Sequence, residues 1–199
     1  DGTFKENLEQ MLPHTSLSSM GSDIADINND GFMDIFSTDM LPEDDYRLKT
    51  TFTFETYAFN EKKVHWGYFH QVPQNALHIN RGGVPKSENQ MLFSDIALLA
   101  GVAKTDWTWG VDIVDLDNDG YKDLFMANGI YRDVTNQDYM DYLMREDNIH
   151  KIMMGEKINF PDLIEKMPST PLSNFAFHND RNLTFTNKTV EWGLEDVSF

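Results

Sequence analysis

Two short stretches of the chain carry acidic side chains at a spacing that suits metal binding. Residues 26–34 (DINNDGFMD) and 115–123 (DLDNDGYKD) both follow the pattern D-x-[DN]-x-D-G-x-x-D. Side-chain oxygens at positions 1, 3, 5 and 9 can converge if the chain curls tightly, and Gly at position 6 permits that turn. Position 7 would add its backbone carbonyl. The predicted ligands are Asp26, Asn28, Asp30, Phe32 and Asp34 in the first stretch, and Asp115, Asp117, Asp119, Tyr121 and Asp123 in the second.

Ligation by oxygen alone suits Ca²⁺, a hard cation that takes 6–8 oxygen ligands at roughly 2.3–2.6 Å. Mg²⁺ fits less well because it demands octahedral geometry and keeps several of its waters. Without a cation, three or four carboxylates would repel one another strongly. A solvated acidic turn is the alternative interpretation, and two matched copies count against it. The sequence therefore predicts two Ca²⁺ sites, with tighter binding at 115–123 because Asn28 replaces a carboxylate in 26–34.

An EF-hand begins with the same pattern but differs at its twelfth position, where it needs a bidentate Glu. Here that position is Ser37 in the first stretch and Met126 in the second. The flanking residues also alternate with period 2, as strands do, whereas an EF-hand loop lies between helices. EF-hand loops, and dockerin-type loops that also require an acid at position 12, are therefore excluded.

The acidic stretches belong to a longer internal repeat. Residues 22–36 match residues 111–125 at nearly every position, with an offset of 89 (26 to 115). Two later pairs of segments also resemble each other, 75–80 with 174–179 and 91–101 with 183–193. Both 75–80 and 174–179 are alternating runs that end in Asn. Self-similarity of this kind indicates a fold built from repeated units.

One unit reads strand, acidic turn, strand, long insertion, strand, strand. Four short antiparallel strands per repeated unit are typical of a β-propeller blade. We therefore expect an all-β fold with helical insertions, made of propeller blades that form part of a larger propeller. The expected organisation is the end of a preceding blade at 1–8, a blade at 9–95 with an insertion at 40–72, a blade at 96–187 with a helical insertion at 129–172, and the start of another blade at 188–199.

The insertions are expected to hold helices. Residues 136–145 begin with Asn and carry apolar residues at helical spacing, which predicts a helix. Residues 149–166 predict one or two more, broken at Pro161. Packing of these apolar stripes against the blades is one interpretation, and a partner-binding face is the other.

Composition limits the classes of partner. The chain has 33 Asp and Glu against 16 Lys and Arg, a formal net charge of −17, and it contains no cysteine. Such a surface repels phosphate backbones and anionic headgroups, so we expect no nucleic-acid partner. The longest apolar run, residues 96–103, is too short to span a bilayer, so we expect no direct membrane insertion. Disulfides and cysteine nucleophiles are excluded. The N-terminal residues, with neither Met nor a signal segment, are expected to lie within a longer protein.

The chain resembles the FG-GAP/VCBS (integrin-type) calcium-binding repeat proteins, of the UnbV/cartilage-acidic-protein type found in exported Bacteroidetes proteins. The resemblance lies in the two acidic stretches, in 39–44, in 105–110, and in 164–171 followed by Asn174. It implies a propeller of about seven blades, Ca²⁺ in blade loops, and an extracellular or outer-membrane-surface location. It implies no defined reaction. The repeat of about 90 residues exceeds a plain FG-GAP unit because of the insertions.

Other candidate residues have simpler structural interpretations. His78 and His178 occupy near-equivalent places in the repeat and are expected to be structural. Trp107 and Trp109 could stack on a sugar or fill a gap between blades, and Trp66 could contribute to an exposed stacking surface. Asp23 and Asp112, three residues before each acidic stretch, are expected either to hydrogen-bond behind the metal ligands or to be solvated.

Three functions remain in contention. A non-catalytic, Ca²⁺-stabilised scaffold or recognition module, binding a protein or glycan at the cell surface, fits the repeat and the absence of catalytic motifs such as H-E-x-x-H and G-x-S-x-G. A glycan-binding component of polysaccharide capture is the first alternative. The second is part of a polysaccharide lyase or hydrolase whose active site lies outside these residues.

Overall fold

The protein is mostly β-sheet with a few short helices. The computed structural model describes residues 2–51, 55–82, 92–145, 149–150, 153–154 and 160–198. Within these residues there are four sheets, two with four strands and two with two strands. The first four-stranded sheet contains β2 (Ser22–Ala25), β3 (Asp34–Ser37), β5 (Ala76–Asn80) and β6 (Phe93–Asp95). The second contains β7 (Thr108–Val114), β8 (Asp123–Asn128), β10 (Phe175–Asn179) and β11 (Phe185–Asn187).

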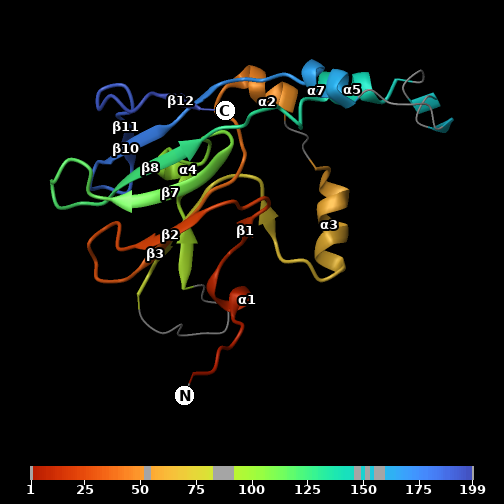
Figure 1. Cartoon of the computed structure of the whole chain (residues 1–199). Coiled ribbons are helices and arrows are strands. Elements are labelled where there is room, and N and C mark those ends of the chain that lie inside the picture. The colour runs from red at the N-terminus through yellow and green to blue at the C-terminus, as the bar shows by residue number, and fades with distance from the viewer. Residues whose placement is uncertain are drawn as a thin grey trace.

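The two four-stranded sheets share one topology. Each is an antiparallel meander whose four strands lie side by side in the order in which they occur in the sequence, β2-β3-β5-β6 and β7-β8-β10-β11 (Figure 1). The predicted strand order within each unit is therefore confirmed. The sheet of β2 to β6 lies within residues 9–95, and that of β7 to β11 lies within 96–187.

Each long insertion returns to the body through a two-residue strand. β4 (Gln71–Val72) pairs in parallel with β1 (Thr15–Ser16) directly before β5 begins. β9 (Leu172–Ser173) pairs antiparallel with β12 (Val197–Ser198) directly before β10.

Helices occupy the insertions, the segment before β1 and the connection from β6 to β7. The helix predicted at 136–145 is confirmed as α5 (Gln137–Leu143), and the Asn136 side chain accepts a hydrogen bond from the Tyr139 N–H. A break at Pro161 was predicted. Pro161 instead lies in the first turn of α7 (Phe160–Lys166), where no backbone donor is needed, so it does not interrupt this helix. Residues 146–148, 151–152 and 155–159, and Met91 in the repeat, lie outside the described residues. The other helices whose bounds fall in the described residues are α1 (Leu8–Met11), α2 (Asp45–Thr51), α3 (Tyr57–His65) and α4 (Ala97–Ala100).

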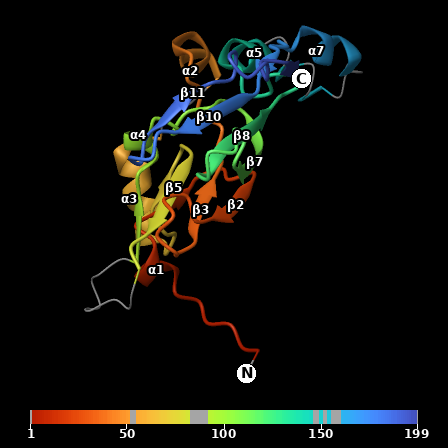
Figure 2. The same ribbon diagram turned by 90° about the vertical axis from the view of Figure 1, so that its left-hand side faces the viewer.

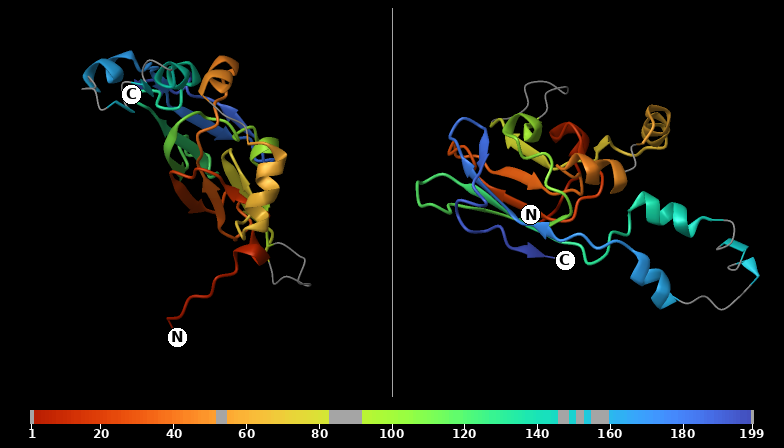
Figure 3. Two further views of the ribbon diagram at one scale, coloured as in Figure 1. Left: turned by 90° about the vertical axis from the view of Figure 1, so that its right-hand side faces the viewer. Right: turned by 90° about the horizontal axis from the view of Figure 1, so that it is seen from above.

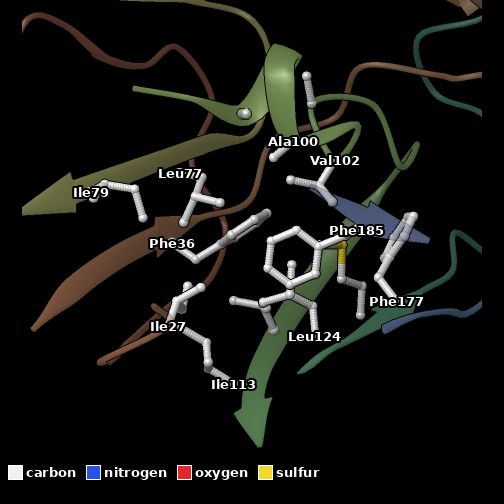
Figure 4. Close-up of a cluster of buried hydrophobic side chains, with 14 residues drawn as sticks. Ile27, Phe36, Leu77, Ile79, Ala100, Val102, Ile113, Leu124, Phe177 and Phe185 are labelled. Atoms are coloured by element: carbon white, nitrogen blue, oxygen red, sulfur yellow. The ribbon is translucent and has the colours of Figure 1, made fainter. Parts of the chain in front are cut away.

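The hydrophobic core lies between the two four-stranded sheets (Figure 4). Alternation along the strands sends one side chain in two inward, as β3 shows with Phe36 fully buried. The core residues contributed by the strands and the adjoining connections are Ile27, Phe36, Leu77, Ile79, Ala97, Ala100, Val102, Ala103, Val111, Ile113, Leu124, Met126, Phe177 and Phe185. Burying one large apolar side chain contributes about 1.5–3 kcal/mol.

The sheets and the insertion helices occupy different parts of the molecule. Figure 2 shows the second sheet above the first, with α2, α5 and α7 gathered at the top. In Figure 3, α5 and α7 project away from the sheets, while α2 stays close to them. The turns that join β2 to β3 and β7 to β8 lie at the other end of the strands, because the insertions follow the far ends of β3 and β8.

Candidate metal centre in two acidic loops

Residues 26–34 and 115–123 form the turns that enter β3 and β8, and we call them loop 26–34 and loop 115–123. Both lie at the same edge of the molecule (Figure 1). They are linked directly, because the Asn29 Nδ2 donates to the carbonyl of Gly120 at 3.1 Å. The second sheet reaches the first loop as well, since Asn179 Nδ2 donates to the Ile27 carbonyl at 2.9 Å.

The two loops follow the same backbone path. Asn29 and Asn118 adopt left-handed conformations, with φ of 58° and 61°. Gly31 and Gly120 follow with φ of 90° and 91°. Asn tolerates this region because its short side chain can hydrogen-bond locally, and Gly has no Cβ to clash. The loop sequence therefore curls without strain at the residues that the motif provides.

The first acidic residue of each loop holds the turn through both of its oxygens. Asp26 accepts from the Asp30 N–H at Oδ1 (3.0 Å) and from the Gly31 N–H at Oδ2 (2.8 Å). Asp115 accepts from Asp119 (3.1 Å) and Gly120 (2.9 Å) in the same way. These bonds direct the carboxylates toward the inside of the loop.

The third and fifth positions add shorter-range bonds of the same kind. In the first loop, Asn28 Oδ1 accepts from the Asp30 N–H (3.1 Å), and Asp30 Oδ1 accepts from the Phe32 N–H (2.8 Å). In the second, Asp117 and Asp119 make the matching bonds at 3.1 and 2.8 Å, the latter to Tyr121. The carbonyls of Phe32 and Tyr121 remain predicted ligands.

The ninth position is a fully buried carboxylate that ties the loop to a third strand. Asp34 accepts from the Ile27 N–H (2.9 Å) and, across the sheet, from the Asn80 N–H at the end of β5 (2.8 Å). Asp123 accepts likewise from Leu116 and Asn179, both at 2.9 Å. Burial raises the pKa of Asp34, and the nearby charges of Asp30 and Asp26 raise it further. A cation in the loop would offset this unfavourable negative charge.

In loop 115–123 the carboxylates converge. Oxygens of Asp115, Asp117 and Asp123 lie within 4.8 Å of one another. Two ligands on one Ca²⁺ can be up to about 4.8 Å apart, twice a bond of about 2.4 Å, so one ion can reach all three. In loop 26–34 Asn28 stands in place of Asp117, so the corresponding trio has two carboxylates and one amide oxygen.

The loops differ in the nitrogen-bearing side chains beside them. Arg181 Nη2 lies 2.6 Å from Oδ2 of Asp119, which lowers the pKa of Asp119 and raises that of Arg181. The Arg181 guanidinium also stacks over the Tyr121 ring at 4.9 Å. His178 Nδ1 lies 3.2 Å from Asp117 and 3.5 Å from Asp123. Arg181 thus already neutralises part of the negative charge of the second loop.

The first loop has small or apolar residues at these positions. Asn80 and Asn179 make equivalent bonds to Asp34 and Asp123, which aligns Ile79 with His178 and Gly82 with Arg181. The Gly82 N–H donates to the Asn80 side chain at 3.0 Å, and the Arg181 N–H donates to the Asn179 side chain at 2.9 Å. A Cβ at Gly82 would lie 2.5 Å from the Phe32 ring, so glycine makes room for Phe32.

His78 and His178 do occupy near-equivalent places on the third strand of each sheet, but the two places are one residue apart. His78 is paired with Ile35 in the first sheet. In the second sheet the counterpart of Ile35 is Leu124, and it is paired with Phe177, the residue before His178. A shift of one residue turns a strand side chain to the opposite face. His78 is therefore buried against His14, with ring centroids 5.5 Å apart, and lies away from loop 26–34.

The remaining candidates take structural or exposed positions. Asp23 acts neither behind the metal ligands nor as a solvated group, because its Oδ2 accepts from the Ile113 N–H of the neighbouring sheet at 2.8 Å. Asp112 is exposed. Trp109 donates to the Gly129 carbonyl at 2.5 Å, and its ring lies 6.4 Å from that of Trp107. Trp66, at the end of α3, is largely exposed.

Sequence reasoning missed Arg181 and the two asparagines that bind the ninth position. The asparagines had a visible signal, since both third strands end in Asn. Arg181 had none, because its counterpart in the repeat is Gly82.

No protein-family model matches the chain, and no curated protein matches it. Among the described residues, no helix has the length and apolar character needed to cross a membrane.

Proposed function

We propose that this chain is a Ca²⁺-binding, non-catalytic part of a β-propeller of the FG-GAP/VCBS type, with one ion in each acidic loop. The observation that carries the proposal is the convergence of Asp115, Asp117 and Asp123 oxygens within 4.8 Å. The matched hydrogen bonds of loop 26–34 extend it to the first site. An all-oxygen donor set favours Ca²⁺ over transition metals, which prefer imidazole or thiolate ligands.

The residues present suit such an ion. Backbone N–H groups already orient the carboxylates, so little ordering is needed on binding. In the first loop, burial and the charges of Asp30 and Asp26 raise the pKa of Asp34, and a bound cation would supply the compensating positive charge. Ca²⁺ would join the turn to three strands at once, since Asp34 also holds the Asn80 N–H at the end of β5. Each site would add about 2.7 kcal/mol at a hundredfold excess of free Ca²⁺ over Kd.

The propeller arrangement is supported by how the two sheets meet. β2 and β7 lie side by side, and Asp23 bonds from one sheet to the N–H of Ile113 in the other. Asp112 holds the corresponding place in the second sheet and is exposed. A further sheet packed beside β7 would receive the same bond from Asp112. The two described sheets would then be successive blades of a larger ring.

A scaffold or recognition role follows from what the acidic side chains are doing. The loop carboxylates are engaged by backbone N–H groups and, in the proposal, by Ca²⁺, so they are not left for acid–base chemistry. The insertions at the other end of the strands would present the surface for a protein or glycan partner. An extracellular or outer-membrane-surface location, which the resemblance implies, would supply millimolar Ca²⁺ for sites of this type.

The proposal is tested by thermal melts in excess EDTA and after restoring Ca²⁺ or Mg²⁺. The parent protein is compared with Asp30→Asn and Asp119→Asn, and with Asp112→Asn, an exposed Asp outside both loops, as the matched control. We expect a Ca²⁺-selective rise in Tm that both loop variants reduce and the control retains. No shift with either ion would overturn the calcium proposal and reopen the loop carboxylates as catalytic candidates.

A further inference from the structure

A cavity of about 420 Å³ lies between α2, α5 and α7, at the end of the sheets away from the acidic loops. Its volume is within the roughly 300–1,000 Å³ range of small-molecule sites. The lining comes from both long insertions: Tyr46 and Arg47 belong to α2, Tyr142 to α5 and Lys166 to α7. Neither insertion forms the cavity alone.

The floor of the cavity is a fixed, buried ionic network. Arg47 donates to Asp133 from Nη1 (3.0 Å) and Nη2 (3.2 Å). On its other side it donates to Asp106 from Nε (2.5 Å) and Nη2 (2.9 Å). Thr170 adds a hydrogen bond to Asp133 at 2.8 Å. Arg47 and Asp133 are both buried, so these bonds hold the floor in one geometry.

The walls are aromatic. Tyr139 and Tyr142 lie side by side on α5 with ring centroids 6.4 Å apart, and the Tyr139 hydroxyl donates to the Leu163 carbonyl at 2.9 Å, which ties α5 to α7. Tyr46 on α2 lines the same cavity and is 71% exposed, so packing in the core does not account for it. An exposed tyrosine at the mouth of a cavity can stack against a flat apolar face and hydrogen-bond through its hydroxyl.

The charges of the lining are balanced. Arg47 and Lys166 oppose Asp133 and Asp138. Asp133 is already engaged by Arg47 and Thr170, so it is not available to ligate a bare cation. Lys166 Nζ donates to the Tyr142 hydroxyl at 2.8 Å and is the cation left to meet an anion, in a chain of net charge −17 that repels anions. The lining therefore favours a neutral ligand with many hydroxyl groups.

The geometry points to this cavity as a binding site for a neutral sugar of one or two residues. The apolar C–H face of the sugar ring stacks on Tyr46, and its hydroxyls hydrogen-bond to the carboxylate of Asp138 and to Lys166. Arg47 and Asp133 act as positioning residues that hold the two insertions together beneath the ligand. The inference concerns residues outside the acidic loops, so it stands or falls separately from the calcium proposal.

The test is isothermal titration calorimetry of the intact, Ca²⁺-supplemented protein with cellobiose, maltose and lactose, and with galacturonic acid as an anionic probe. Tyr46→Ala is compared with Tyr57→Ala, a matched control because Tyr57 is 78% exposed on α3 of the same insertion and does not line the cavity. We expect saturable binding of a neutral disaccharide that Tyr46→Ala weakens about tenfold and Tyr57→Ala leaves unchanged.

Three results would overturn the inference: no binding of any neutral sugar, equal binding by the parent and Tyr46→Ala, or a preference for galacturonic acid. Asp138→Ala provides a second variant, because Asp138 is in the first turn of α5 and its truncation removes a hydroxyl acceptor without removing an aromatic ring. A melt of each variant in parallel shows whether it folds, so a loss of binding is not confused with unfolding.

Discussion

Arg181 donates two hydrogen bonds to Oδ2 of Asp119, from Nη2 at 2.6 Å and from Nε at 3.2 Å. In the other acidic loop the matching carboxylate, Asp30, receives a hydrogen bond from the Asn28 amide at 2.9 Å, and Gly82 takes the place of Arg181. A cation entering loop 115–123 must therefore compete with a guanidinium, whereas one entering loop 26–34 competes with a neutral amide.

The first prediction concerns this competition. Arg181→Gly should strengthen Ca²⁺ binding at loop 115–123 severalfold, because Asp119 is released and glycine relieves the φ of 63° at this position. The affinity of loop 115–123 is measured by calorimetry in an Asp30→Asn background, in which the site in loop 26–34 is weakened. Once Arg181 is removed, loop 115–123 should show the tighter binding that its carboxylate count predicts. Arg81→Ala, an exposed arginine beside the first loop, is the control. An unchanged affinity after Arg181→Gly would show that the ion pair does not compete.

The second prediction concerns Gly82. Gly82→Ala should destabilise the protein by about 1–3 kcal/mol, since its φ of 69° disfavours a Cβ and the new methyl would meet the Phe32 ring at 2.5 Å. Gly67→Ala is the control, with φ of 89° and no atom within 4 Å of the added Cβ. Urea unfolding should show a larger loss for Gly82→Ala, and equal losses would assign the whole effect to backbone strain.

The third prediction concerns the link between the insertions. Arg47→Met should cost about 3–5 kcal/mol, because it leaves the buried carboxylates of Asp106 and Asp133 without a counter-charge. The triple variant that also carries Asp106→Asn and Asp133→Asn should recover part of this loss. Unfolding free energies of the two variants check the idea, and a triple variant less stable than Arg47→Met would contradict it.

The fourth prediction is a pH dependence with two opposing parts. The hydrogen bond from His14 to Asp95, at 3.1 Å, raises the pKa of His14 above 6.5, so its stabilising effect is complete below pH 6.5 and is lost as pH rises through the raised value. Burial lowers the pKa of His78, so the unfolded state binds its proton more readily and stability is lost as pH falls below 6.5.

Single variants separate the two parts. His14→Gln should leave a protein whose Tm falls on acidification, by about 2–4 °C for each kcal/mol, because the effect of His78 remains. His78→Phe, which copies Phe177 at the equivalent strand position, should leave a protein whose Tm rises on acidification. Melts at about pH 5.5 and 8 bracket both groups. The same sign of change in both variants would refute the assignment.

The sequence determined the parts of this protein that depend on near neighbours. The curl of each acidic loop was predictable because its bonds, such as Asp26 to Gly31, join residues at most a few positions apart. The strand order followed from period-2 alternation and the repeat, and the start of α5 followed from Asn136. These features arise from backbone geometry and local hydrogen bonding, which the residue types themselves specify.

Tertiary structure decided what stands beside these elements. Arg181 and Asp119 are 62 positions apart, and Arg47 and Asp133 are 86 apart, so no local pattern indicates that they meet. What His78 and His178 contact depended on the packing of the two sheets, which bury Leu77 and Phe177 between them. Contacts of this kind follow from how whole faces pack to exclude water, a property of the assembled chain that no short segment carries.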